Sequence, residues 1–517
     1  MSQYTFFLCL GGTGTQVGSA IGNLYPFLKD AKIAEDGDVY KVFIMDKDTH
    51  GKNYDYCVNV CERYNTLHST LPMNAMSPYE IYPNIYQELQ GQAGSLSKDY
   101  TVMDLIGFDS RIKELANMCW KEEKQKESLR DGNNRDPSRG SLDAHVCLEY
   151  FEGSSLFSEL EKLTKSNNIG NLRLVILAGT TGGMGSSLIV PLIEKIKGYY
   201  NKDDAEKKLI FENLRIDLVL LGTYFKIPLN PNASRKVDEI GTAIDSYYRA
   251  SNQLKELEEG VVKKFMSQKW WVYYVAFPGF DEVCGAFNKN GAEKRKAHIV
   301  ELLAALAALD LAKQPSPAFY TTRVPSNKDG KVNISWEEIP LGDSLKRPIR
   351  AFMKCLIIVA TQVYPRLSLD LNLKAKDVYI TKYIKKPKDN VGTMDALLSV
   401  TKQWLTNMIP YVEFWYEVQK YSELGQKGVV NLFQQDEMEE LKDIFINVVN
   451  NPYTAWGDSK PINKMPMCSA SWMKYVDEIK PDKKELNGIL DSKNVVDSLF
   501  KFMLSDIYTM LMKRKED

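Results

Sequence analysis

Two stretches of sequence decide the fold: residues 4–21, YTFFLCLGGTGTQVGSAI, and residues 172–188, LRLVILAGTTGGMGSSL. In each, a short apolar run predicts a buried strand, glycines follow, and a helical pattern comes next. Glycine lets backbone N–H groups approach a ligand closely, and the start of a helix offers partial positive charge to an anion. The pattern favours a phosphate-binding loop after each strand. The alternative is a tight strand–helix turn that holds no ligand.

Three more apolar runs, Val39–Met45, Ile216–Tyr224 and Trp270–Phe277, predict further strands, with helical patterns between them. Strand–helix–strand order at this spacing indicates parallel crossovers, and therefore an α/β fold with a Rossmann-type parallel sheet. In such sheets ligands bind at the carboxyl ends of the strands, in the loops that lead into helices. Both glycine loops stand at such junctions.

The chain is long enough for several domains, with 517 residues against roughly 100–200 per domain. A helical pattern covers residues 292–311, and its second half, IVELLAALAALDL, is apolar nearly all round, which predicts a buried core helix. We therefore expect a first domain over 1–290 that holds the glycine loops, the core helix over 291–313, a second α/β domain over 314–412, and a helical C-terminal region over 413–517.

Two connecting segments have turn chemistry. Residues 318–336, AFYTTRVPSNKDGKVNISW, predict a hairpin with Asp329-Gly330 in its turn. Residues 131–140, DGNNRDPSRG, predict a loop.

Composition excludes several classes of protein. There are 66 Lys+Arg and 67 Asp+Glu, so the net charge of −1 argues against a chain built to coat nucleic acid or acidic membrane. Eight cysteines are too sparse for a disulfide scaffold, and Cys57 and Cys61 have no second pair to complete a zinc site, which favours a reducing, cytoplasmic location. The N-terminus does not resemble a signal peptide, and no apolar run reaches the ~20 residues that span a bilayer.

The glycine loops differ from two common phosphate-binding motifs. A dinucleotide fingerprint needs G-x-G-x-x-G, but after Gly12 and Gly14 the third position holds Val17. The second loop has no lysine where a Walker loop requires one. Phosphates would instead be held by backbone amides, hydroxyl groups and two helix N-termini.

Taken together, the two loops resemble the tubulin/FtsZ superfamily, and specifically its divergent bacterial tubulin-like branch. The tubulin pattern G-x-x-G-x-Q-[IV]-G is met by Gly11, Gly14, Gln16, Val17 and Gly18. The family signature G-G-G-T-G-[ST]-G is similar to residues 179–185, where the first, fifth and seventh positions agree and the others depart. The order of elements also resembles the family through about residue 313.

The resemblance implies that the ligand is GTP or GDP with Mg²⁺. The implied contacts of the two loops are Gly11, Gly12, Thr13, Gly14, Thr15 and Gln16, and Gly179, Thr180, Thr181, Gly182, Gly183, Met184, Gly185 and Ser186.

Other implied contacts follow the remaining strands. Asp46 and Asp48 would approach ribose, phosphate or magnesium, since carboxylates suit Mg²⁺; a helix cap or turn acid is the alternative. Arg139 and Gly140 would approach the γ-phosphate, with Arg139 as a phosphate fork.

The implied ribose and base contacts come later in the chain. Asn230 and Asn232 lie in the segment that corresponds to the family's ribose loop. Asp281 would accept hydrogen bonds from the guanine edge, with the N-cap of a short helix as an equal alternative. His298 would be a base-pocket or packing residue.

Family GTPases complete hydrolysis across a subunit contact, where an acid of the next subunit orients the attacking water. The nearest run here is GKVNISWEE, residues 330–338. Glu337, Glu338 or Asp343 would provide that carboxylate, which must reach the water by a hydrogen bond.

The resemblance therefore implies a GTP-binding protein that assembles head-to-tail with itself into filaments and hydrolyses GTP at each contact, serving an unidentified cargo or adaptor. Two other functions stay open. One is a nucleotide-regulated scaffold, or a component of a bacterial defence system, that binds GTP with little or no turnover. The other is a dinucleotide-dependent oxidoreductase, against which the missing third glycine counts.

Overall fold

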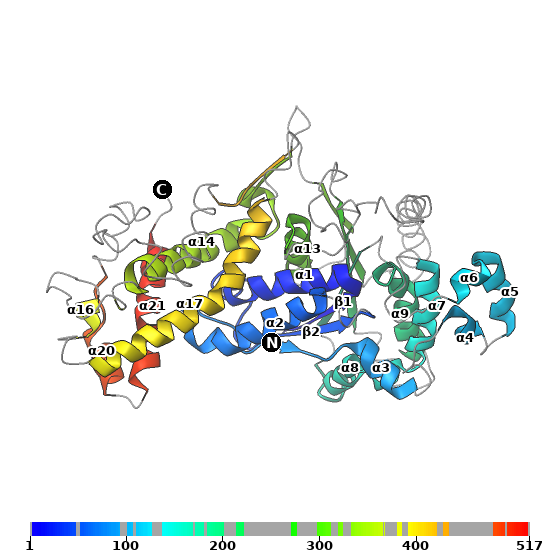
Figure 1. Cartoon of the computed structure of the whole chain (residues 1–517), viewed down its shortest axis with the longest axis horizontal. Coiled ribbons are helices and arrows are strands. Elements are labelled where there is room, and N and C mark those ends of the chain that lie inside the picture. The colour runs from blue at the N-terminus through cyan, green and yellow to red at the C-terminus, as the bar shows by residue number, and fades with distance from the viewer. Residues whose placement is uncertain are drawn as a thin grey trace. The chain divides into compact units, whose positions relative to one another are not determined.

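Figure 1 shows the chain as a computed structural model. It describes residues 3–47, 52–93, 101–106, 110–126, 137–168, 171–179, 183–200, 214–221, 270–276, 297–311, 319–323, 332–364, 367, 380–384, 391–420, 428–433, 479–491 and 494–514.

The chain forms two compact units, and each is interrupted in sequence. Unit 1 comprises residues 1–22, 35–62 and 79–332; unit 2 comprises residues 23–34, 63–78 and 333–517. This division differs from the one expected from the sequence. The helix over residues 299–311 lies inside unit 1, and residues 333–517 form one unit together with two segments from the first eighty residues.

The described residues of unit 1 form a seven-stranded sheet in which each adjacent pair of strands is parallel. The strand order is β3-β2-β1-β4-β5-β6-β7. The strands are β1 (Tyr4–Leu10), β2 (Val39–Met45), β3 (Glu80–Ile81), β4 (Leu172–Gly179), β5 (Arg215–Leu221), β6 (Trp270–Ala276) and β7 (Phe319–Arg323). The first six follow the order of a doubly wound α/β sheet. The five strands expected from the sequence are confirmed, two of them with the expected bounds.

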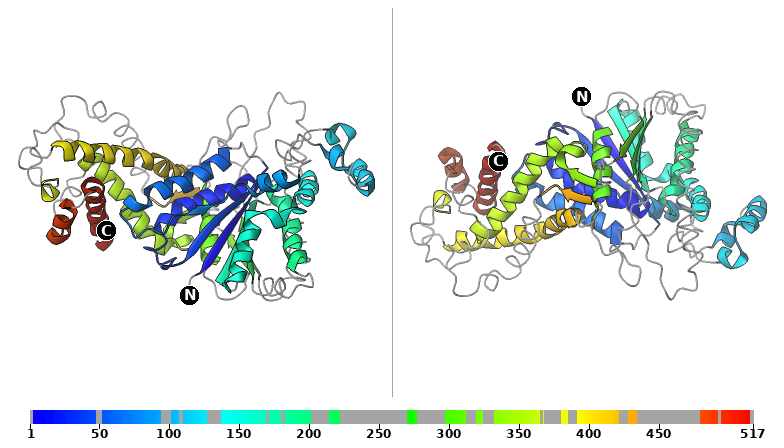
Figure 2. Two further views of the ribbon diagram at one scale, coloured as in Figure 1. Left: turned by 90° about the horizontal axis from the view of Figure 1, so that it is seen from below. Right: turned by 90° about the horizontal axis from the view of Figure 1, so that it is seen from above.

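Helices cover both faces of this sheet (Figure 2). Because side chains alternate along a strand, Phe6, Leu8 and Leu10 of β1 share one face. They pack in one apolar core with the helices α3 (Ile85–Ala93), α7 (Pro137–Leu148), α8 (Ser155–Lys165) and α9 (Gly185–Tyr200).

The opposite face of β1 carries Cys9, and helices α1 (Gly11–Leu24) and α2 (Lys52–Leu67) cover it. A Cβ added at Gly18 of α1 would lie 2.7 Å from the Cys9 sulfur and 3.3 Å from the sulfur of Cys57 in α2. A larger residue at position 18 would therefore push α1 away from the sheet.

Helix α13 (Ile299–Leu311) lies on this second face, and all its residues except Asp310 are buried. Arg173 of β4 and Arg215 of β5 donate hydrogen bonds of 3.5 and 3.1 Å to the carbonyl of Leu311. These cations stabilise the C-terminus of the helix, where the partial charge is negative. The prediction of a buried core helix is confirmed for these residues.

Shorter helices of unit 1 connect the main elements. They are α4 (Val102–Ile106), α5 (Ser110–Cys119), α6 (Glu122–Gln125) and η3 (Phe151–Gly153).

The described residues of unit 2 are mainly helical. Its long helices are α14 (Gly342–Ile358), α17 (Val391–Lys420) and α21 (Val495–Lys513). Its other elements are η1 (Tyr25–Phe27), η2 (His68–Thr70), β8 (Val332–Ser335), η7 (Trp336–Glu338), η8 (Val359–Val363), α16 (Ile380–Tyr383), β9 (Gly428–Asn431) and α20 (Lys483–Leu490).

Aromatic side chains fill the core of unit 2. Trp336 and Trp415 lie with ring centroids 6.0 Å apart, and Trp415 packs edge-on against Phe433 at 5.6 Å. The segment of residues 23–34 contributes to this core, because the ring of Phe27 lies 5.6 Å from the ring of Phe352 in α14.

Two local expectations were wrong. β7 and β8 are not a hairpin: β7 pairs with β6, whereas β8 pairs with β9 in a separate two-stranded sheet. An Asp-Gly turn is a local signal, and the burial of Ile334 and Trp336 next to β9 outweighs it. The loop expected through Gly140 is also too long, because α7 begins at Pro137, whose fixed φ suits the first position of a helix.

Among the described helices, none is long and apolar enough to cross a membrane.

Candidate functional site

The two glycine loops start side by side at the carboxyl edge of the sheet. β1 and β4 are neighbours, and Leu10 pairs in register with Ala178. Gly11 has a φ of +65°, and a Cβ added to it would lie 2.9 Å from the amide nitrogen of Gly185. A Cβ added at Gly185 would in turn lie 2.9 Å from the carbonyl oxygen of Leu10. The loops touch each other through backbone atoms, which requires glycine at both positions.

This contact lies at the point where the strand order reverses. The next strand after β1 is β2 on one side, and the next strand after β4 is β5 on the other. In doubly wound sheets, the crevice outside the carboxyl ends of two such strands is the usual ligand site.

Three helices have their first turns at this crevice. α1 begins at Gly11 and α9 at Gly185, directly in the loops. A Cβ added at Gly140, in the first turn of α7, would collide with the carbonyl oxygen of Gly183 and the hydroxyl of Ser187. None of the three first turns contains an acidic residue. The N–H groups and dipoles at the N-termini of three helices therefore favour an anion here.

The hydroxyl and amide side chains of the loops have defined partners. Thr13 lies against Gly179, Thr15 donates a hydrogen bond of 2.9 Å to the Gly11 carbonyl, and Ser187 donates one to the Gly183 carbonyl. The side-chain amide of Gln16 donates to Asn53 at 3.2 Å. Gln16, Met184 and Ser186 are buried. The structure thus brings the described members of both loops together.

Asp46 joins the first glycine loop from the end of β2. Asn84 holds its backbone: the side-chain amide of Asn84 donates to the Asp46 carbonyl at 2.7 Å, and the amide oxygen accepts from the Asp46 N–H at 3.2 Å. One carboxylate oxygen of Asp46 lies 3.8 Å from where a Cβ of Gly12 would be. Asp46 is only 5% exposed. Its carboxylate therefore lies beside the N-terminus of α1.

A buried ion pair next to Asp46 was missed by the sequence analysis. The ammonium of Lys47 lies 3.0 Å from the carboxylate of Asp143 in α7, and both side chains are at most 1% exposed. The hydroxyl of Tyr86 donates to the same carboxylate at 2.9 Å, and the ammonium lies 5.6 Å from the centre of the Tyr86 ring. Lys47 directly follows Asp46, but no local pattern indicates a partner in a distant helix.

His298 lies at the start of α13. Its Nδ1 accepts a hydrogen bond of 3.1 Å from the Val300 N–H, which puts the ring proton of the neutral side chain on Nε2. The C-terminal end of α13 meets the early residues of β4 and β5, so the helix runs antiparallel to the strands. His298 is buried and lies toward the same edge of the sheet as the glycine loops.

The three acids considered for hydrolysis lie in unit 2. Glu338 accepts a hydrogen bond of 2.9 Å from the Ser335 N–H and completes a capping box. Glu337 lies 2.8 Å from Lys346, and this hydrogen bond lowers the pKa of its exposed carboxyl to about 2. Asp343 is exposed in the first turn of α14. Glu337 and Glu338 thus have local structural partners.

Several expected site residues lie outside the described residues: Asp48, Thr180, Thr181, Gly182, Asn230, Asn232 and Asp281. Arg139 is in the first turn of α7. Within the described part of the chain, no group of three or more His, Cys, Asp or Glu side chains is arranged to hold a metal ion.

Comparison with known proteins gave no match to a protein-family model, a curated protein or a solved structure.

Proposed function

We propose that this chain binds a guanine nucleotide, GTP or GDP, in the crevice between its two glycine loops. The observation that supports this most strongly is the backbone contact between Gly11 and Gly185 at the carboxyl ends of neighbouring parallel strands. Backbone amides that converge at the start of helices suit a polyphosphate, which carries several negative charges over a short length.

In this proposal the loops hold the phosphates through amides and hydroxyls. Asp46 lies beside the α1 N-terminus and would hold Mg²⁺ together with phosphate oxygens, since Mg²⁺ is usually bound by one or two carboxylates plus substrate phosphates. His298 lies toward the same edge of the sheet, where it would face the base or ribose.

We further propose that the nucleotide lies at a head-to-tail contact between copies of the chain, which would assemble into filaments. A contact of this kind that does not close into a ring produces a filament. Glu337, Glu338 or Asp343 of the next copy would then orient the attacking water. The support is that Asp46 is the acid beside the described glycine loops, and it suits magnesium better than water activation. A scaffold that binds GTP without turnover is the alternative.

A dinucleotide is the second candidate ligand, and one observation favours it. In dinucleotide-binding folds the third glycine of the fingerprint lets the first helix pack closely on the first strand. Gly18 does this here, since a Cβ on it would lie 2.7 Å from the Cys9 sulfur. The glycine is displaced by one position, but it has the same physical task.

The test is to identify the bound nucleotide. Purified protein is denatured, the released nucleotide is separated by ion-pair chromatography, and a fluorescent GTP analogue is then displaced with GTP, ATP and NAD in turn. Guanine nucleotide in the extract and displacement by GTP support the proposal. NAD in the extract, with displacement at lower concentrations of NAD than of GTP, would establish the dinucleotide instead. An extract without nucleotide and no binding of the analogue or of NAD would refute both.

A further inference from the structure

The buried ion pair between Lys47 and Asp143 lies on a path of contacts that joins the two glycine loops. Lys47 follows Asp46, whose carboxylate lies beside Gly12 of the first loop. Asp143 follows Gly140 by three residues, and residues so spaced share one face of a helix. Gly140 in turn lies against Gly183 and Ser187 of the second loop. The ion pair therefore links the segment that contacts the first loop to the helix that contacts the second loop.

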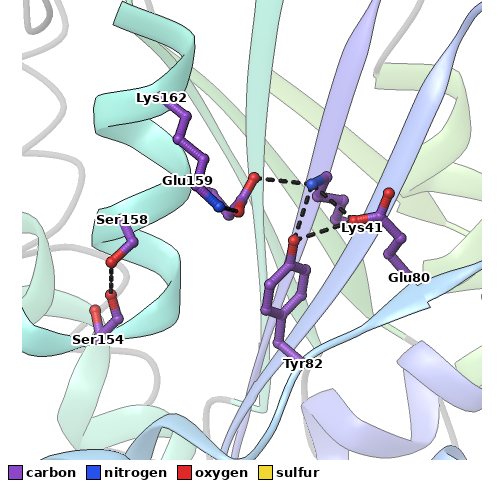
Figure 3. A network of polar contacts seen from close by, with 7 residues as sticks. All are labelled: Lys41, Glu80, Tyr82, Ser154, Ser158, Glu159 and Lys162. Atoms are coloured by element: carbon purple, nitrogen blue, oxygen red, sulfur yellow. Dashed lines mark hydrogen bonds and ion pairs between the residues drawn. The ribbon is translucent and has the colours of Figure 1, made fainter. Parts of the chain in front are cut away.

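A second lysine, on the strand β2 that leads to Lys47, provides a contrast. Lys41 binds Glu159, Glu80 and Tyr82 at 2.7–2.8 Å, as Figure 3 shows. Burial alone would lower the pKa of Lys41, but its hydrogen bonds to the two carboxylates raise the pKa above its usual value. Lys41 is near the start of β2, and its network joins β2, β3 and α8 without contacting a residue of either glycine loop in the described part of the chain.

The two networks differ in exposure. Glu80 is 53% exposed, so the Lys41 network is partly solvated and is easily explained as a structural link. Lys47 and Asp143 are 1% and 0% exposed. Removing two charges from water opposes their attraction, and apolar side chains of similar size often stabilise a fold as well as a buried pair does. Fold stability alone therefore does not explain the charges at 47 and 143.

We infer that Lys47 and Asp143, with Tyr86, are positioning residues that hold the two glycine loops at the separation required by the phosphates of a nucleoside di- or triphosphate. This inference rests on the proposed function in one respect, the identity of the ligand. The positioning role itself does not depend on the ligand. The ion pair fixes the first turn of α7 against the second glycine loop, and it holds the adjoining Asp46 at the first glycine loop.

The test compares three variants of the full chain. Lys47→Met/Asp143→Leu/Tyr86→Phe removes the charges and the hydroxyl together, which avoids leaving a buried charge alone. Asp143→Asn keeps the shape but removes one charge. Lys41→Met is the matched control, because it breaks the lysine network of β2, six residues before Lys47, and Glu159 keeps Lys162 as a partner.

Two measurements are made on each variant whose thermal unfolding remains cooperative. One is the affinity for a fluorescent GTP analogue with Mg²⁺. The other is amide hydrogen exchange of residues 11–15 and 183–188 without nucleotide. We expect the triple variant and Asp143→Asn to bind the analogue about tenfold more weakly or worse, and to exchange faster in both loops, while Lys41→Met matches the wild type in both.

The outcomes separate the inference from the proposed function. If the wild type binds no nucleotide but the triple variant still exchanges faster in both loops than Lys41→Met, the positioning role holds and the proposed ligand is wrong. If the triple variant matches the wild type in exchange and affinity, the pair is only structural and the inference is overturned. Equal losses in Lys41→Met would also overturn it, since the effect would then be general destabilisation.

Discussion

Arg215 donates a hydrogen bond of 2.9 Å to the carboxylate of Asp217, two residues further along β5, and the same guanidinium donates to the last residue of α13. The other carboxylate oxygen of Asp217 is buried and has no hydrogen-bond partner among the described residues. Burial raises the pKa of Asp217 to about 7, although the charge of Arg215 acts in the opposite direction. The carboxyl group thus gains a proton more easily in the folded chain than in the unfolded one.

This predicts a pH dependence of stability. An acid with a raised folded pKa contributes stability that is fully present below its unfolded pKa, about 4, and is lost as the pH rises through about 7. Asp217→Asn keeps an oxygen that can accept from Arg215 but cannot ionise. Between pH 4 and pH 8 the wild type should lose up to about 4 kcal/mol of unfolding free energy relative to this variant. Parallel thermal unfolding curves at several pH values measure the difference, and an identical pH dependence in both proteins would refute the assignment.

The contact between the glycine loops predicts a sharp effect at Gly11. Gly11→Ala puts a side chain on a residue with a φ of +65°, 2.9 Å from the Gly185 amide. Backbone strain of this kind costs roughly 1–3 kcal/mol. We expect a folded but less stable protein whose affinity for GTP falls about tenfold or more. Gly488→Ala is the control, because a Cβ there meets nothing within 4 Å and should stabilise α20 by about 0.5–1 kcal/mol. Unchanged nucleotide binding in Gly11→Ala would argue against phosphates at this loop.

The guanine assignment predicts selectivity for the base. Asp281 is expected to accept hydrogen bonds from the guanine edge, which ATP does not offer in the same pattern. A site built to pair with a polar edge rejects a base that leaves it unpaired by a large factor. GTP should therefore displace a labelled analogue at concentrations at least about tenfold below ATP, and Asp281→Ala should reduce this preference. Equal displacement by the two nucleotides would contradict the assignment.

Hydrolysis completed by a neighbouring copy predicts a dependence on protein concentration. Turnover per molecule should rise with concentration, because each site is complete only at a contact. Glu337→Ala, Glu338→Ala and Asp343→Ala are compared. Replacing the residue that orients the water should slow hydrolysis, while GTP binding is retained. Glu338→Ala should in addition lower stability by about 1 kcal/mol, since it removes half of a capping box.

A mixing experiment checks this arrangement. The slow acid variant and Gly11→Ala should recover some turnover when combined, because each provides what the other lacks. Turnover that is independent of concentration in a monomeric protein would rule out the shared site. No turnover at any concentration would favour the scaffold.

Some elements and contacts of this protein could be predicted from the sequence, and others could not. The bounds of β1 and β2 were predictable because each is a mostly apolar run of the length of a strand, ended by Gly11 or Asp46. The place of both glycine loops between a strand and a helix was also predictable, since the pattern is local. The two-residue strand β3 was not, because too short a run has no pattern. The link from Lys47 to Asp143 was not either: both charges look like surface residues until the fold brings them together.

The hairpin predicted over residues 318–336 was wrong for the same reason: the pairing partner is distant in sequence. An Asp-Gly dipeptide favours a turn between its immediate neighbours, but β8 pairs with β9, which lies far along the chain. Long-range burial of Trp336, whose indole N–H donates to the Leu432 carbonyl, stabilises that pairing. No local pattern contains this information.

Unit 2 is formed by segments that are distant in sequence, and this has a consequence for folding during synthesis. Phe27 packs on Phe352, and Asp30 accepts a hydrogen bond from Tyr508, so these early residues meet partners that are synthesised hundreds of residues later. Contacts so distant in sequence form slowly, and an apolar segment that waits for them is exposed to aggregation. Newly made chains should therefore depend on chaperones until α21 is complete, and a shortened gene product that ends before α21 would leave Asp30 without the hydroxyl of Tyr508.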